Sequence, residues 1–260
     1  MKVNLHTHTR FSDGSSDPED YVKAAIRQGF DKLGFSDHAP VPFKNNFAIS
    51  DDKIDEYVST ILSLKKRYTK PTILLALEAD YIPGITTEFD HFRKSYPLDY
   101  LIGSVHLVKG DDSGELWFID GPDISVYDEG LKNIFSGDGR KAVTAYYSQI
   151  QEMVATQKPE IIGHLDKIKM YNHDRYFLET DPWYQTLVDK TLDVIQKTGG
   201  TIEINTRGIY KKRSDTLFPG PEILKKIHQR GLPVIISSDA HKPDELGLGF
   251  EGADEEGILC

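Results

Sequence analysis

The sequence contains very little cysteine and no long apolar segment. Cys260 is the single cysteine among 260 residues, which excludes a disulfide within the chain and a thiolate metal cluster. No stretch approaches the roughly 18 apolar residues that a membrane-spanning helix needs. The opening MKVNLHTHTR contains no apolar signal region. We therefore expect a soluble, cytoplasmic protein with no membrane partner.

Basic charge is also scarce. Lys and Arg total 31 against 41 Asp and Glu, a net charge of −10, and the longest basic run is the KKR at 211–213. Bulk charge therefore disfavours long nucleic acid as a partner. With 38% hydrophobic and 28% charged residues, the composition excludes disordered, collagen-like and coiled-coil classes. It leaves the oligomeric state open.

Short apolar runs alternate with segments of helical period along the whole chain, which predicts repeated βα units around a parallel sheet. We expect seven strands, at 2–8, 32–36, 72–79, 99–105, 160–165, 201–205 and 233–237. Helices are expected at 18–28, 52–68, 86–95, 140–157, 182–198 and 221–230. A (β/α) barrel of about 250 residues fits this length.

One connection is too long for a plain loop. Residues 107–139 are rich in Gly and Asp, and we interpret them as a functional insertion or lid. With no Ser/Gly-rich linker anywhere, residues 1–260 are expected to form a single barrel domain that carries this insertion.

Ionisable side chains occur where the predicted strands end, which in a parallel barrel is the face that carries active sites. Each could have an ordinary structural role, such as capping a helix, but six of the seven strands deliver His, Asp or Glu to this rim. The candidates are His6, His8, Asp13, His38, Glu78, His106, His164, Asp239 and His241.

This coincidence favours a metal site. Imidazole and carboxylate ligands without thiolate suit zinc, manganese or iron. Nine ligands are too many for one ion, so we expect two or three divalent metal ions. Their natural chemistry is hydrolysis of a phosphoester by a metal-bound hydroxide, with a small phosphate monoester as the partner.

The same residues lie in motifs that resemble the PHP (polymerase and histidinol phosphatase) superfamily. These motifs are HTHTRFSDG at 6–14, SDH at 36–38, LEAD at 77–80, GSVH at 103–106, GHLD at 163–166 and SSDAH at 237–241. The resemblance covers essentially the whole chain. It implies a distorted, TIM-like (β/α)7 barrel with a trinuclear metal centre at the C-terminal rim of the strands.

The resemblance also implies how the ligands divide. A first metal would take His6, His8, Glu78 and Asp239, with Glu78 bridging to a second metal. The second would add His106 and His164, and a third would take Asp13, His38 and His241. Glu78 and Asp239 are thereby expected to be catalytic.

The segments at 38–43, 163–172 and 203–224 look most like the monofunctional histidinol-phosphate phosphatases. Many of those enzymes have His at the position of Asp13, whereas SDG is common in other PHP phosphoesterases. A phosphoesterase that acts on nucleotides, short oligonucleotides or phosphotyrosine is therefore an alternative. An alternative of another class is a non-catalytic metal-binding barrel.

A phosphate dianion also needs a fixed cation beside the metals. Arg207 follows strand six, on the rim sector without a predicted ligand, and is the expected phosphate clamp. Further candidates are Lys211, Arg213 and Arg10. Asp166 lies two residues after His164 and is expected to orient that histidine or to donate a proton to the leaving group.

Acidic and aromatic residues of the insertion are candidates to cover the ammonium and imidazole of histidinol phosphate. These are Glu115, Trp117, Asp120 and Asp123. The histidines outside the strand ends, His91, His173 and His228, are interpreted as surface or helix residues.

Overall fold

The seven predicted strands are present and form one parallel sheet. The structure is a computed structural model that describes residues 1–110 and 114–251. The strands are β1 Val3–Asn4, β2 Lys32–Phe35, β3 Thr72–Asp80, β4 Tyr100–Ser104, β7 Ile161–Ile162, β8 Thr201–Asn205 and β9 Val234–Ser237. They are hydrogen-bonded side by side in chain order.

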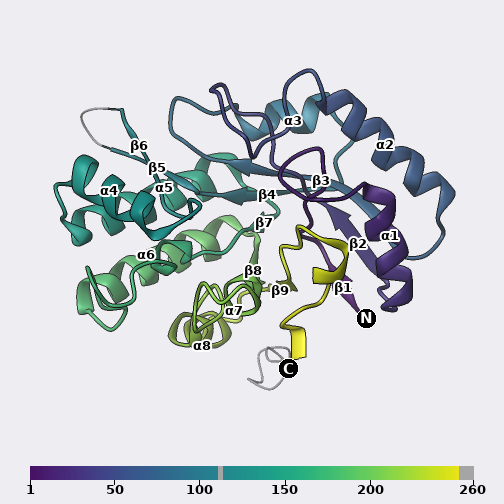
Figure 1. Cartoon of the computed structure of the whole chain (residues 1–260). Helices are drawn as coiled ribbons and strands as arrows, with labels where there is room; N and C mark the ends of the chain where they lie inside the picture. The colour runs from purple at the N-terminus through teal and green to yellow at the C-terminus, as the bar shows by residue number, and fades with distance from the viewer. Residues whose placement is uncertain (111–113, 252–260) are drawn as a thin grey trace.

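The sheet curves until its first and last strands meet. Beyond the ends of β1 and β9, Thr7 forms a parallel bridge with Ala240, and the His8 amide donates to the Ala240 carbonyl at 2.8 Å. Helices lie around the outside of the strands (Figure 1). The distorted TIM-like (β/α)7 barrel that the sequence predicts is confirmed.

Helices occupy the predicted segments and begin and end for recognisable reasons. They are α1 Pro18–Arg27, α2 Ile54–Arg67, α3 Phe89–Ser95, α5 Gly139–Gln157, α6 Pro182–Thr198 and α8 Pro221–Gln229. Proline opens α1, α6 and α8, where its missing N–H costs nothing. Gly199, with φ of +86°, ends α6 in a conformation that other residues rarely adopt.

Short helices that the sequence did not predict follow the strands on the rim side. They are α7 Arg207–Tyr210, after β8, and the 3₁₀ turns Lys167–Lys169 and Pro243–Glu245. Single turns bury too few residues to leave a periodic pattern, so sequence reasoning could not find them.

The barrel interior changes from apolar to polar along the strands. Ala76, Tyr100, Ile102 and Ile161 form a small apolar cluster that is separate from the main core. Side chains two positions further along a strand point to the same face. Glu78 therefore follows Ala76, and Ser104 follows Ile102, on the inner side of the barrel. This places polar groups directly above the apolar layer.

The insertion is structured. It contains an antiparallel pair, β5 Leu107–Lys109 and β6 Leu116–Phe118, followed by α4 Ile124–Phe135. Its residues 111–113 lie outside the described part, as does Cys260. The predictions of a lid and of a single domain over 1–260 therefore stay predictions. Within the described residues, no helix is long and apolar enough to cross a membrane.

Candidate metal centre

The centre is built around Glu78, which is 1% exposed and lies near the end of β3. Its Oε2 lies 3.2 Å from His6 Nε2, 3.4 Å from His8 Nε2 and 3.2 Å from His38 Nδ1. Its Oε1 lies 3.1 Å from His164 Nε2. Imidazoles from several strand ends therefore converge on one carboxylate, as expected for a bridging ligand.

The candidate ligands form groups whose donor atoms lie within 4.8 Å of one another. These groups are His6/His8/Asp239, Glu78/His106/His164, His8/Asp13/His38/His241 and His38/Asp80/His106. The structure thus brings all nine predicted ligands together and adds Asp80. The first three groups resemble the three predicted sets with two differences: the first group lacks Glu78, and His8 also belongs to the Asp13 group.

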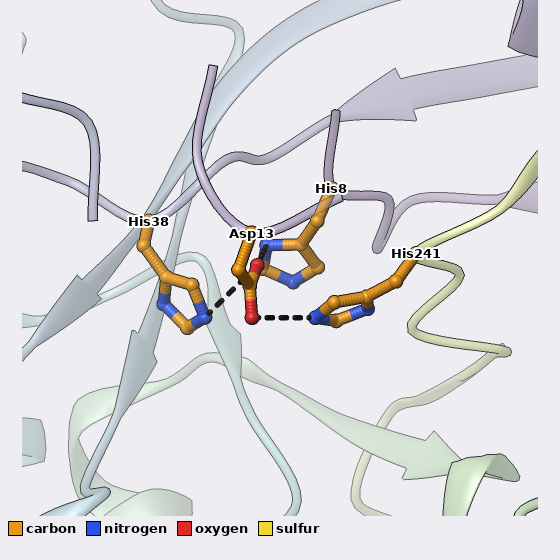
Figure 2. Close-up of side chains that lie close together, drawn as sticks. All are labelled: His8, Asp13, His38 and His241. Carbon is orange, nitrogen blue, oxygen red and sulfur yellow. Dashed lines mark hydrogen bonds and ion pairs between the residues drawn. The ribbon is translucent and has the colours of Figure 1, made fainter. Parts of the chain in front are cut away.

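Asp13 is carried over the centre by a tight loop after β1. Its carboxylate faces His8, His38 and His241, with Oδ2 3.0 Å from His241 Nε2 (Figure 2). The loop folds back so closely that a Cβ at position 14 would lie 2.1 Å from the His8 carbonyl oxygen. Gly14 is therefore required to bring Asp13 over His8.

Several buried polar atoms of the centre have no hydrogen-bond partner within the described residues. These include His6 Nε2, both ring nitrogens of His8, His38 Nδ1 and Asp239 Oδ1. Leaving one such atom unsatisfied costs about 1–3 kcal/mol. Their convergence, with only nitrogen and oxygen donors, fits borderline divalent cations such as zinc.

The charge state of the centre also suits a cation. Burial by itself would raise the pKa of Glu78, but facing imidazoles, His6 and His38 among them, hold that pKa well below its usual value. The pKa of Asp239 is likewise lowered, against burial, chiefly by His6. Burial and two neighbouring imidazoles lower the pKa of His8 to about 3. The carboxylates are thus ionised and His8 is neutral, whereas Glu203 raises the pKa of His6 well above its usual value against the effect of burial.

Two buried carboxylates that sequence reasoning missed contact the outer nitrogens of ligand histidines. Asp80 Oδ1 lies 2.9 Å from His106 Nδ1, and Glu203 Oε1 lies 2.5 Å from His6 Nδ1. A signal was available for both, since each is an acidic residue on the inward face of an otherwise apolar strand.

The centre opens into a small pocket of about 100 Å³. Three cations line it besides the candidate ligands: Lys167, Arg207 and Arg213. Arg207 is 15% exposed, and its Nη1 donates to the Asp239 carbonyl at 2.7 Å. Lys167, whose Nζ lies 3.4 Å from Asp120 Oδ2, was not predicted. It belongs to a one-turn 3₁₀ helix that the sequence does not reveal.

Two predicted phosphate ligands point elsewhere. Arg10 is exposed and pairs with Asp17, and Lys211 pairs with Glu245. Neither side chain is among those that line the described pocket. Both residues follow strands closely in the sequence. Each side chain, however, pairs with a carboxylate that does not line the pocket.

The orienting role predicted for Asp166 is wrong in this structure. Its carboxylate accepts from the Gly220 amide at 2.8 Å and pairs with Lys169 Nζ at 2.7 Å. The chain turns into the 3₁₀ helix at this point, so the strand alternation that we assumed beyond His164 does not apply. Donation of a proton by Asp166 stays a prediction.

Of the four candidates in the insertion, Asp120 reaches the pocket, together with Phe118. Trp117 is 1% exposed and packs inside the insertion, with its ring centroid 4.7 Å from that of Tyr127. Asp123 caps α4 by accepting from the Ser125 amide. Glu115 is exposed and is not among the residues that line the described pocket. His91, His173 and His228 are also exposed, which agrees with the interpretation of these histidines as surface or helix residues.

This chain is similar to known proteins in sequence and in fold. The histidinol-phosphatase of Bacillus subtilis is 27% identical over 275 residues, covering 96% of this chain and 97% of its own length. A Listeria monocytogenes structure described as a candidate histidinol phosphatase has a TM-score of 0.84 at 21% identity, with 96% and 99% of the two chains covered.

A second solved structure is histidinol phosphate phosphatase from Lactococcus lactis, complexed with zinc, L-histidinol and phosphate. Its TM-score is 0.71 at 21% identity, with 98% of this chain and 92% of that chain covered. Residues 4–207 of this chain match the PHP domain, which is most of its length and includes seven of the nine candidate ligands. The chain belongs to the PHP domain family.

Proposed function

We propose that this protein is a metal-dependent phosphatase that hydrolyses histidinol phosphate to histidinol and phosphate. The observation that carries the proposal is one pocket that joins the carboxylate and imidazole cluster around Glu78 to the cations Arg207, Lys167 and Arg213. The names of the relatives, and the histidinol and phosphate bound in the Lactococcus lactis structure, support this substrate.

The ligand groups support two or three divalent ions, with zinc, manganese or iron as candidates. Glu78 would bridge two of them, and the Asp13 group would hold a third. Divalent ions bound there would supply a nucleophile at neutral pH and neutralise charge that develops on the phosphate. Asp239 would contribute a carboxylate between the first and third groups.

The protein's own cations would bind and orient the phosphate. Arg207 offers the planar edge of a guanidinium, which can contact two phosphate oxygens at once. Arg213 lines the same pocket. Lys167 is 5% exposed, and its Nζ also lies 3.9 Å from Asp239 Oδ2. It would therefore hold a point charge next to the ligand cluster.

The organic part of the substrate would lie against the pocket wall that the insertion contributes. Asp120 Oδ1 is buried with no hydrogen-bond partner among the described residues, and it could accept from an ammonium group. Phe47 and Phe118 line the same pocket, with ring centroids 6.0 Å apart. They would give a flat heteroaromatic ring an apolar wall.

The test is turnover by metal-loaded protein of histidinol phosphate and of a panel of nucleotides, short oligonucleotides and phosphotyrosine. We expect the highest kcat/KM for histidinol phosphate. Rapid turnover of nucleotides with none of histidinol phosphate would overturn the substrate. Less than about one metal equivalent per chain would overturn the metal centre.

The proposed location is the cytoplasm. This proposal rests on the single cysteine of the sequence.

A further inference from the structure

Glu203 is a buried carboxylate that the proposed hydrolysis does not use directly. It lies in the middle of β8 and is 1% exposed. Its side chain points to the inner face of the barrel, as does that of Asn205. Among the described residues, Glu203 is not one of those that line the pocket. A buried charge at this position needs several hydrogen-bond donors to be tolerated.

Four donors meet its two oxygens. Oε2 accepts from the His164 amide at 2.8 Å and from Asn205 Nδ2 at 3.3 Å. Oε1 accepts from Ser237 Oγ and lies 2.5 Å from His6 Nδ1. The two amide N–H groups can only donate, so Oε2 is an acceptor. As a carboxylate, Glu203 has no hydrogen to donate, so Oε1 is an acceptor toward Ser237 Oγ and His6 Nδ1 as well. Through these bonds it joins the ends of β1, β7, β8 and β9.

This arrangement decides which nitrogen of His6 faces the metal centre. With Glu203 as acceptor, Nδ1 keeps its hydrogen whether the ring is neutral or charged. The hydrogen that can leave is therefore on Nε2, which lies 3.2 Å from Glu78 Oε2 and 3.8 Å from Asp239 Oδ1. In the opposite tautomer, Nε2 would direct a hydrogen at those ligand atoms and could not bind a cation.

The second contact acts on the backbone of another ligand. His164 has φ of +21°, a conformation that residues with a side chain rarely adopt. The bond from its amide to Glu203 is one of the contacts that hold this backbone in place. We propose that Glu203 is a positioning residue that fixes His6 as an Nε2 metal ligand and seats His164 beside it.

The test compares zinc binding by the wild-type protein and by Glu203→Gln. Glutamine keeps the size of the side chain but replaces one carboxylate oxygen with an NH2 group. In either orientation this NH2 group faces a hydrogen-bond donor of the surrounding residues. We expect a 10- to 100-fold loss of zinc affinity, the usual range for a residue behind a metal ligand. Glu160→Gln is the matched control, because Glu160 contacts Arg93 and the Leu101 amide instead. Its zinc affinity should equal that of the wild type.

A second measurement is made first on the wild-type protein, where it does not depend on the folding of any variant. Nitrogen NMR of the histidine rings in the wild-type protein should show a slowly exchanging Nδ1–H on His6, both without metal and with zinc. Zinc should shift the Nε2 signal. In Glu203→Gln the Nδ1–H signal should be lost or exchange faster, whereas Ser237→Ala, which keeps the carboxylate, should retain it.

Zinc coordination of His6 through Nδ1, or a metal-free ring without Nδ1–H, would overturn the proposal. So would a folded Glu203→Gln protein with wild-type zinc affinity. The inference rests on the metal centre of the proposed function and not on its substrate. A wild-type protein that binds no zinc would refute that metal centre, and the metal-free NMR measurement would still decide the contact between Glu203 and His6.

Discussion

Replacement of Arg207 by alanine tests the phosphate clamp most directly. Its Nη1 is engaged with the Asp239 carbonyl at 2.7 Å and lies 2.7 Å from His241 Nδ1, so the Nε and Nη2 edge is the part that would meet phosphate. A charge-assisted hydrogen bond contributes about 1.5–3 kcal/mol. Two of them, partly replaced by water in the variant, correspond to about 3–4 kcal/mol. We therefore expect kcat/KM to fall by roughly 10²–10³-fold.

The assay is steady-state hydrolysis of histidinol phosphate, with metal content measured on the same samples. Arg207→Lys keeps the charge but loses the two-bond geometry, so its loss should be intermediate. A kcat/KM within about threefold of the wild type, at wild-type metal content, would refute the clamp. Parallel loss of metal and activity would show instead that Arg207 acts through Asp239 and His241.

Three further outcomes follow from the described geometry. Glu78→Gln should abolish turnover and reduce metal per chain in elemental analysis, and wild-type occupancy would contradict a bridging role. Burial opposes charge on His106, but Asp80, Asp120 and Glu78 raise its pKa to about 10. Its contribution to the stability of the metal-free protein is therefore present below about pH 6.5 and lost as pH rises through about 10. Calorimetry should show this loss, and a flat profile over that interval would contradict it. Trp117→Ala should lower the free energy of unfolding, measured in urea, by about 3–5 kcal/mol, because it leaves a cavity in the core of the insertion. A decrease below about 1 kcal/mol would contradict that packing.

Much of the barrel could be predicted because its strands are short, apolar and separated by amphipathic helices. Both ends of β8 and of α6 lie at the predicted residues. For α6 this is because Pro182 and Gly199 mark the limits of the helix. The candidate ligands followed from one rule, that parallel strands place their C-terminal ends on the same rim. α4 was missed because the Gly- and Asp-rich composition around it obscured its helical period.

The residues that support the site were harder to predict. Glu203 lies in the middle of β8 and Asp80 is the last residue of β3, and their roles depend on histidines from other strands. Lys167 lines the pocket because the chain turns after β7. Arg10 does not line the pocket, because its side chain pairs with Asp17 elsewhere. Each outcome depends on a neighbour that is distant in the chain or on a local turn without a periodic signal.

By itself, the sequence determined the architecture and the set of candidate ligands, because hydrophobic period and strand ends are local properties of the chain. The tertiary structure decided which imidazoles face Glu78 and with which nitrogen, which cations reach the pocket, and which carboxylates lie behind the ligands. These features depend on distances between side chains from different strands. Such distances are set only when the barrel closes between β1 and β9.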